Sequence, residues 1–249
     1  MENTRLGKGM SVEDINQYVE ELVGELTVEE KTYMMSGHGF MHQFMELDDR
    51  RWGARTYQAG GGNAKRKLPT LQFSDGPRGI VTKNSTCFPV SMARGATWDV
   101  HLEERVGDVI GKEIRAHGGN LFGGVCINLL RHPAWGRAQE TYGEDPYQLG
   151  EFGAALVRGV QKHNVIATVK HFAANSIENA RFKVNVKIDE RTLREVYLPH
   201  FKRCVDEGVG SVMSAYNKLN GEYCGQNNDL LNVILKTEWG FDGFVHSDW

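Results

Sequence analysis

The sequence predicts an α/β protein whose parallel strands curl into a (β/α) barrel. Three observations lead to this prediction. Short apolar runs alternate with helical patterns along most of the chain, which is typical of βα units and a parallel sheet. Neither GxGxxG nor a Walker lysine is present, and the glycine-rich run 117–124 precedes a strand, which disfavours a doubly wound nucleotide-binding sheet. Polar residues stand directly after several strands, where barrels place their functional loops.

Two capped helices are predicted at the start of the chain. Ser11 and Asp14 form a capping-box pattern before an apolar repeat that runs to Val23. Thr27 repeats the pattern before a shorter helix that runs through Met35. Residues 36–70, which are rich in glycine and basic residues, predict a long irregular segment of a kind that is usually functional or mobile.

The part of the chain in which strand and helix patterns alternate is predicted to form the barrel. Strands are predicted at the apolar runs 71–73, 126–130, 165–169, 211–214 and 244–245. Helices are predicted between them, at roughly 100–117, 146–163, 190–207 and 228–238. The third helix opens on Asp189 and Glu190, as the helix dipole favours. No internal repeat and no linker interrupts the pattern, so residues 1–249 are predicted to form one domain.

Composition excludes several classes of function. The chain has 249 residues, enough for one large barrel, and its net charge of −3 argues against nucleic-acid and membrane-surface binding. No apolar run is long enough to span a bilayer. No signal peptide is visible at the start, which favours the cytoplasm over secretion or the periplasm. The four cysteines lack metal-ligand spacing and are interpreted as core or near-surface thiols at Cys87, Cys126, Cys204 and Cys224.

The polar residues after the strands suit a sugar. They are Asp75 and Arg78, the stretch 131–140, Lys170 and His171, Tyr216 and Asn217, and Ser247 to Trp249. Carboxylates and guanidinium groups make strong hydrogen bonds to sugar hydroxyls, and an indole packs on the apolar face of a pyranose. Cleaving a glycosidic bond needs one carboxylate near the anomeric carbon and a second group that protonates the leaving oxygen. Nearby cations would hold such a carboxylate ionised.

Each motif also has a purely structural interpretation. The Lys170–His171 pair is compatible with a salt bridge at the barrel rim, and Asp75 with a turn. Arg137 and Glu140 are compatible with a surface pair on one helical turn, and Asp248 with a solvated acid. Five such stretches at successive strand ends favour a common site.

Six stretches together resemble a known family. They are SDGPRG (74–79), HPAWGRAQETYGEDPYQLG (132–150), KHFAAN (170–175), IDERTLREVYLPHF (188–201), VMSAYNKLNG (212–221) and ILKTEWGFDGFVHSDW (234–249). In this order they resemble the N-terminal barrel domain of glycoside hydrolase family 3, the β-glucosidase and β-xylosidase group. The resemblance implies a (β/α)8 TIM-type barrel over residues 1–249. The barrel would be incomplete at its C-terminal end and would lack the family's C-terminal α/β sandwich domain.

The resemblance also implies an activity. It is retaining, exo-acting hydrolysis of small β-glycosides or oligosaccharides, which releases a terminal sugar, β-D-glucose before others, through a covalent glycosyl-aspartate. Asp248 matches the nucleophile. The matching sugar-binding positions are Asp75, Arg137, Lys170, His171, Arg181, Tyr216 and Trp249. No metal and no organic cofactor is implied.

Departures from the family pattern limit these expectations. The stretch KHFAANSIENARF differs from the KHFPGHG-type loop that carries an acid/base histidine, which disfavours the N-acetylglucosaminidase branch. The other branch takes its acid/base glutamate from the C-terminal domain. The acid/base residue is therefore expected outside this chain, which would be inactive or nearly so without that domain in cis. His246 stands where the family more often has an aliphatic residue.

Two other functions compete with this one. A non-catalytic or degenerate sugar-binding barrel would use the same polar set, and the missing acid favours it. A lyase or aldolase that forms a Schiff base on Lys170 is disfavoured, because the neighbouring motifs match the hydrolase.

Overall fold

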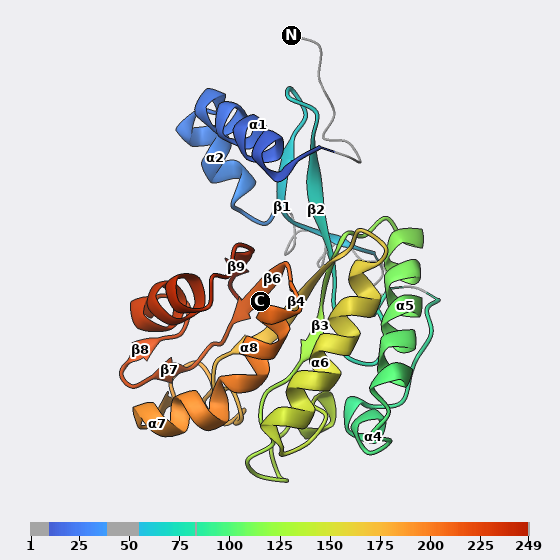
Figure 1. Cartoon of the computed structure of the whole chain (residues 1–249), viewed down its shortest axis with the longest axis vertical. Coiled ribbons are helices and arrows are strands. Elements are labelled where there is room, and N and C mark those ends of the chain that lie inside the picture. Colours follow the sequence, from blue (N-terminus) through green and yellow to red (C-terminus); the bar gives the residue numbers. More distant parts are fainter. Residues whose placement is uncertain (1–9, 39–54, 83, 249) are drawn as a thin grey trace.

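The computed structural model describes residues 10–38, 55–82 and 84–248. A six-stranded sheet in the order β1-β2-β3-β4-β6-β9 forms its centre. The strands are β1 Tyr57–Asn63, β2 Leu68–Ser74, β3 Leu121–Cys126, β4 Ile166–Phe172, β6 Ser211–Ser214 and β9 Phe244–His246. From β2 to β9 every pairing is parallel. Helices pack along the outside of this curled sheet (Figure 1), so the fold is an incomplete α/β barrel.

The four predicted barrel helices are present. They are α5 Val100–Ala116, α6 Pro146–Gln161, the divided segment α7 Glu190–Thr192, η2 Leu193–Tyr197 and α8 Pro199–Asp206, and η3 Asp229–Glu238. Two short helices, α4 Ser91–Gly95 and η1 Ala138–Glu140, were not predicted. Aspartates cap three of them, since Asp99, Asp145 and Asp189 each accept a backbone N–H of the first turn. Helices α5, α6 and α8 lie side by side (Figure 1), and the predicted helix 190–207 is divided into α7, η2 and α8.

The two N-terminal helices are also confirmed. They are α1 Val12–Glu25 and α2 Val28–Met34, and each begins with a complete capping box, at Ser11 and at Thr27. The prediction of an irregular segment at 36–70 is wrong for its second half, where β1 and β2 form an antiparallel hairpin. Gly61 and Gly62 have positive φ and the register shifts near Gly60, so the hairpin has no regular apolar alternation to detect. Residues 39–54 of that prediction lie outside the described residues.

The strand predicted at 126–130 is misplaced, since it shares only Cys126 with β3. The run 121–130 is apolar almost throughout and nearly all of it is buried, so hydrophobicity alone does not fix where the strand ends. The structure places the strand at Leu121–Cys126 and continues the chain as a buried loop. The loop stays attached to β4, because the Ile127 N–H donates to the Lys170 carbonyl at 3.0 Å.

A smaller sheet and the core complete the framework. Strands β5 Asn185–Val186, β7 Lys218–Leu219 and β8 Glu222–Tyr223 form a three-stranded sheet that ties the loop after β4 to the loop after β6. Large aromatic residues fill the space between the main sheet and its helices, namely Phe122, Phe152, Phe172 and Phe201. All four cysteines are free; Cys87 is exposed and the other three are buried, as predicted. Among the described residues no helix is long and apolar enough to cross a membrane.

Candidate functional site

A cavity of about 180 Å³ opens at the carboxyl ends of the parallel strands. It is lined by Phe73, Asp75, Arg137, Glu140, Lys170, Arg181, Met213, Tyr216 and Asp248. Its lining thus holds three carboxylates and three cations. Lys170 comes from β4, and the other five charged residues come from the segments that follow β2, β3, β4 and β9. Larger hollows of about 490 and 680 Å³ adjoin α2 but bring no carboxylates and cations together. Hollows of about 310 and 330 Å³ contain both kinds of charge, but no residue of the six-stranded sheet lines them. The smaller cavity is therefore the candidate site.

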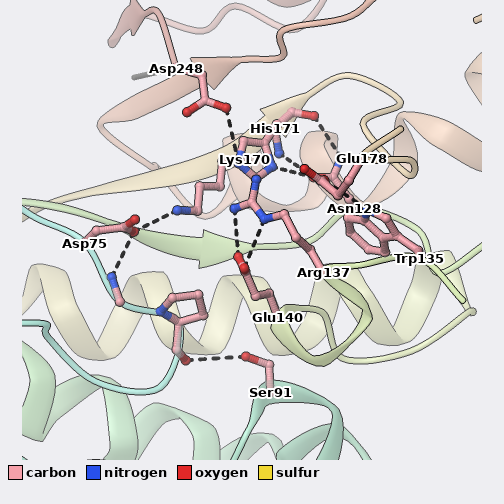
Figure 2. Close-up of polar contacts among 12 residues, drawn as sticks. Asp75, Ser91, Asn128, Trp135, Arg137, Glu140, Lys170, His171, Glu178 and Asp248 are labelled. Atoms are coloured by element: carbon pink, nitrogen blue, oxygen red, sulfur yellow. Dashed lines mark hydrogen bonds and ion pairs between the residues drawn. The ribbon is translucent and has the colours of Figure 1, made fainter. Parts of the chain in front are cut away.

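Asp75 and Lys170 form the most deeply placed ion pair of the cavity. Lys170 Nζ lies 2.7 Å from Asp75 Oδ1, and the Gly76 N–H donates to the same oxygen at 2.8 Å (Figure 2). The Lys170 side chain is only 2% exposed, whereas that of Asp75 is 28% exposed. Burial lowers the pKa of Lys170, but the negative groups around it, Asp75 foremost, together outweigh burial, and the net pKa is raised. The pair therefore presents a fixed cation and a partly open carboxylate to the cavity.

Arg137 and Glu140 form a second pair on the cavity wall. The guanidinium donates from Nε and Nη2 to the two carboxylate oxygens of Glu140, at 3.0 and 2.8 Å (Figure 2). Burial lowers the pKa of Arg137, and the hydrogen-bonded Glu140 raises it well above its usual value. The surface-pair interpretation is thus right about the contact and wrong about its place, because both residues line the cavity.

His171 lies directly behind the cavity and is completely buried. Asn128 Oδ1 accepts hydrogen bonds from the His171 backbone N–H at 2.8 Å and from Nδ1 at 2.7 Å, while Asn128 Nδ2 donates to the His171 carbonyl at 2.9 Å. Burial, helped by the Arg137 and Lys170 charges, holds the pKa of His171 well below its usual value. The ring is therefore neutral with its proton on Nδ1. Its Nε2 lies 3.6 Å from Asp248 Oδ2 (Figure 2).

Tyr216 and Arg181 bound Asp248 on another side. Burial, and then the charge of Asp248 and a hydrogen bond to it, raise the pKa of Tyr216 to about 12. The Arg181 guanidinium lies over the Tyr216 ring, 4.9 Å from its centroid. Glu178 holds Arg181 through an ion pair of 2.8 Å and accepts the Trp135 indole N–H at 3.1 Å. Asp248 thus faces a neutral imidazole and a neutral phenol.

The structure brings together seven of the eight site residues predicted from the sequence. Six of them line the cavity and His171 contacts one of the six. Trp249, the eighth, lies outside the described residues. The prediction missed the apolar lining residues Phe73 and Met213, and it missed the supporting residues Asn128 and Glu178. An asparagine inside the apolar run 126–130 was a signal, since a buried amide needs partners, whereas Glu178 gave no signal beyond its place three residues before Arg181.

Known proteins are similar to this chain in sequence and in fold. The beta-glucosidase of Rhizobium radiobacter is 38% identical over 239 residues, which are 93% of this chain and 27% of the relative. Thermostable beta-glucosidase B of Acetivibrio thermocellus is 37% identical over 93% of this chain and 30% of its own length. The solved structure of beta-glucosidase 3B from Thermotoga neapolitana in complex with glucose matches with a TM-score of 0.84 and 39% identity, covering 93% of this chain and 34% of that one.

The chain spans about a quarter to a third of the length of these relatives. Residues 17–249 match the sequence profile described as "Glycosyl hydrolase family 3 N terminal domain". Because that match covers almost the whole sequence and the curled sheet agrees with it, this chain belongs to glycosyl hydrolase family 3 and represents its N-terminal domain.

Proposed function

We propose that the protein acts as a retaining, exo-acting β-glycoside hydrolase that releases a terminal β-D-glucose, with Asp248 as its nucleophile. The observation that carries the proposal is the position of Asp248. It lines the cavity just after β9, 3.6 Å from His171 and hydrogen-bonded to Tyr216. Glucose is favoured because the Thermotoga neapolitana relative has been solved in complex with it.

The proposed reaction has two steps. Asp248 attacks the anomeric carbon, the bond from that carbon to the leaving oxygen breaks, and a glycosyl-aspartate ester forms. The leaving oxygen takes a proton from a general acid. A water molecule then attacks the anomeric carbon, gives its proton to the base and frees the Asp248 carboxylate together with the sugar. Asp248 lies 3.6 Å from the neutral His171 and is hydrogen-bonded to the neutral Tyr216, and these two contacts hold the carboxylate in the cavity.

The other predicted residues would hold the sugar. The Asp75 carboxylate accepts from sugar hydroxyls, while Lys170, Arg137 and Arg181 donate to them. The buried His171 would support the sugar site from behind, through its 3.6 Å contact with Asp248. Trp249 keeps its predicted role as a stacking surface.

The general acid is proposed to come from a further domain of the intact protein. Protonating Asp75 or Glu140 would abolish the ion pair that each carboxylate makes, so neither is suited to donate a proton. The proposal includes a C-terminal α/β sandwich domain, which would supply the acid, and an eighth βα unit, which would close the barrel. This chain by itself would then be inactive or nearly so on natural glycosides, since general acid catalysis is typically worth about 10²–10⁴-fold.

A trapping experiment tests the nucleophile without needing the acid. Incubation with 2,4-dinitrophenyl 2-deoxy-2-fluoro-β-D-glucoside, whose leaving group departs without protonation, should add one fluoroglucosyl group to Asp248. Peptide mass spectrometry of the digested protein locates the adduct. The Asp248→Asn variant should give none, while Asp242→Asn, a change in an acid outside the cavity, should react like the wild type. If the wild type binds glucose but forms no adduct, the site is a non-catalytic sugar-binding barrel.

Lys170 provides a test of sugar binding. The Lys170→Met variant removes the buried cation and its hydrogen bonds, and we expect affinity for methyl 1-thio-β-D-glucopyranoside to fall about 10- to 100-fold, because hydrogen bonds from charged donors are strong. Isothermal titration calorimetry measures the change. Lys162→Met makes the same substitution at a partly exposed lysine that pairs with Glu104, and it should leave the affinity unchanged. An equal affinity in both variants would place the sugar elsewhere.

A further inference from the structure

An exposed phenylalanine adjoins the cavity on the loop that follows β4. The Phe182 side chain is 56% exposed. Its ring meets the Tyr216 ring edge-on, with the centroids 4.6 Å apart, and Tyr216 lines the cavity. The Arg181 guanidinium lies 5.1 Å from the Phe182 centroid and 4.9 Å from the Tyr216 centroid. Phe182, Arg181 and Tyr216 therefore form a continuous surface at the cavity, here named the aromatic rim.

The aromatic rim is held from several directions. Glu178 binds the Arg181 guanidinium at 2.8 Å, and the Tyr223 hydroxyl of β8 donates to the Phe182 carbonyl at 3.1 Å. The N–H groups of Lys183 and Val184 both donate to one carbonyl of the same turn, at 2.7 and 2.8 Å. The fold thus fixes the backbone on both sides of an apolar ring that it leaves open to solvent. A contact surface fixed in this way costs little entropy when a ligand binds.

The chemistry of the rim differs from that of the cavity. The cavity is lined mostly by charged residues and is large enough for one small ring, so a group attached to the anomeric carbon of a bound sugar must extend out of it. At the rim the polar groups are already engaged, because Arg181 is shared between Glu178 and the proposed sugar site and the Tyr223 hydroxyl binds the backbone. A second sugar would need free hydrogen-bonding partners there, whereas a flat aromatic group needs only an aromatic ring and a guanidinium beside it.

We propose that the aromatic rim is a leaving-group site that favours β-glucosides with an aromatic aglycone, with Phe182 as the specificity-determining contact. This inference rests on the proposed function, since it takes the cavity as the sugar site. It adds the substrate class: aryl β-glucosides are bound in preference to alkyl glucosides and to disaccharides. Phe182 contacts the leaving group only, so it changes selectivity and leaves the sugar contacts intact.

Binding of three non-hydrolysable ligands to the 249-residue chain tests the inference. They are phenyl 1-thio-β-D-glucopyranoside, methyl 1-thio-β-D-glucopyranoside and methyl β-thiocellobioside. Titration calorimetry of the wild type should show that the phenyl ligand binds most tightly. In Phe182→Ala the preference for phenyl over methyl should fall about two- to tenfold, as expected for one aromatic pair, with methyl affinity unchanged. Phe182→Leu keeps apolar bulk without a ring, so its preference for phenyl over methyl should lie between those of the wild type and Phe182→Ala.

The outcomes separate the inference from the proposed function. Tyr147→Ala removes a ring that is 77% exposed on α6 and lines no part of the cavity, and it should keep the wild-type preference. If no ligand binds the wild type, the proposed sugar site fails and the inference fails with it. If the methyl ligand binds but Phe182→Ala keeps the phenyl preference, only the inference is overturned. If Phe182→Ala loses more affinity for the thiocellobioside than for the phenyl ligand, the rim is a second sugar site and the choice of an aromatic group is overturned.

Discussion

Replacing Arg94 by methionine is expected to lower the free energy of unfolding by about 3–5 kcal/mol, because it leaves a buried carboxylate without its cation. The Arg94 and Glu103 side chains are 3% and 0% exposed, and two hydrogen bonds of 2.8 and 3.0 Å join them. The Tyr142 hydroxyl donates to the same carboxylate at 2.6 Å. Arg94 also donates to the Pro77 carbonyl at 2.9 Å, two residues after Asp75. The same contact therefore anchors the loop that carries the Asp75–Lys170 pair.

Urea unfolding followed by circular dichroism measures this change. Arg191→Met is the matched control, because Arg191 is 83% exposed and pairs with Glu195 on the surface, where such a pair contributes about 0–1 kcal/mol. The double variant Arg94→Met with Glu103→Leu should recover much of the loss, since it removes the buried charge together with its partner. If Arg94→Met is no less stable than Arg191→Met, the buried pair does not stabilise the fold.

The barrel could be predicted from the sequence because its elements carry local signals. The capping boxes at Ser11 and Thr27 and the aspartate caps at Asp145 and Asp189 announce helix starts within a few residues. The four residues of β6 also form a self-contained apolar run, 211–214, that matches the strand. The β1–β2 hairpin could not be predicted, because its glycines remove the side chains whose alternation would have revealed it.

The site could be predicted as a set of residues but not as a set of contacts. The motifs place Asp75 and Lys170 95 positions apart, and only the folded sheet brings them to 2.7 Å. Asn128 stands out as an amide inside the apolar run 126–130, but the sequence does not show that its partner is His171, 43 positions away. The cis peptide bonds 170–171 and 172–173 also had no signal, since neither precedes a proline. Residues show which chemistry is available, while long-range pairing decides which groups meet.

Acid is expected to destabilise the fold through buried histidines before most carboxylates titrate. His200 is completely buried on α8, and burial lowers its pKa from 6.5 to about 3. Below pH 6.5 the unfolded chain binds a proton at this histidine, whereas the folded protein does not bind it until the pH approaches 3. The stability that depends on the neutral ring is therefore complete above pH 6.5 and is lost as the pH falls towards 3. His171 shifts in the same direction. His200 alone contributes a slope of up to about 1.4 kcal/mol per pH unit in this window.

Urea unfolding at pH 7, 6 and 5 measures that slope. The variant His200→Gln has a side chain that does not titrate, so its free energy of unfolding should decline less steeply with acid, by up to about 1.4 kcal/mol per pH unit. The comparison concerns slopes, so a lower stability of the variant at pH 7 does not affect it. His101→Gln, a change at an exposed position of α5, should keep the wild-type slope. An unchanged slope in His200→Gln would mean that His200 stays protonated or reaches water in the folded protein. The acid sensitivity would then have to come from the site, where His171 is held neutral between Asn128 and Asp248.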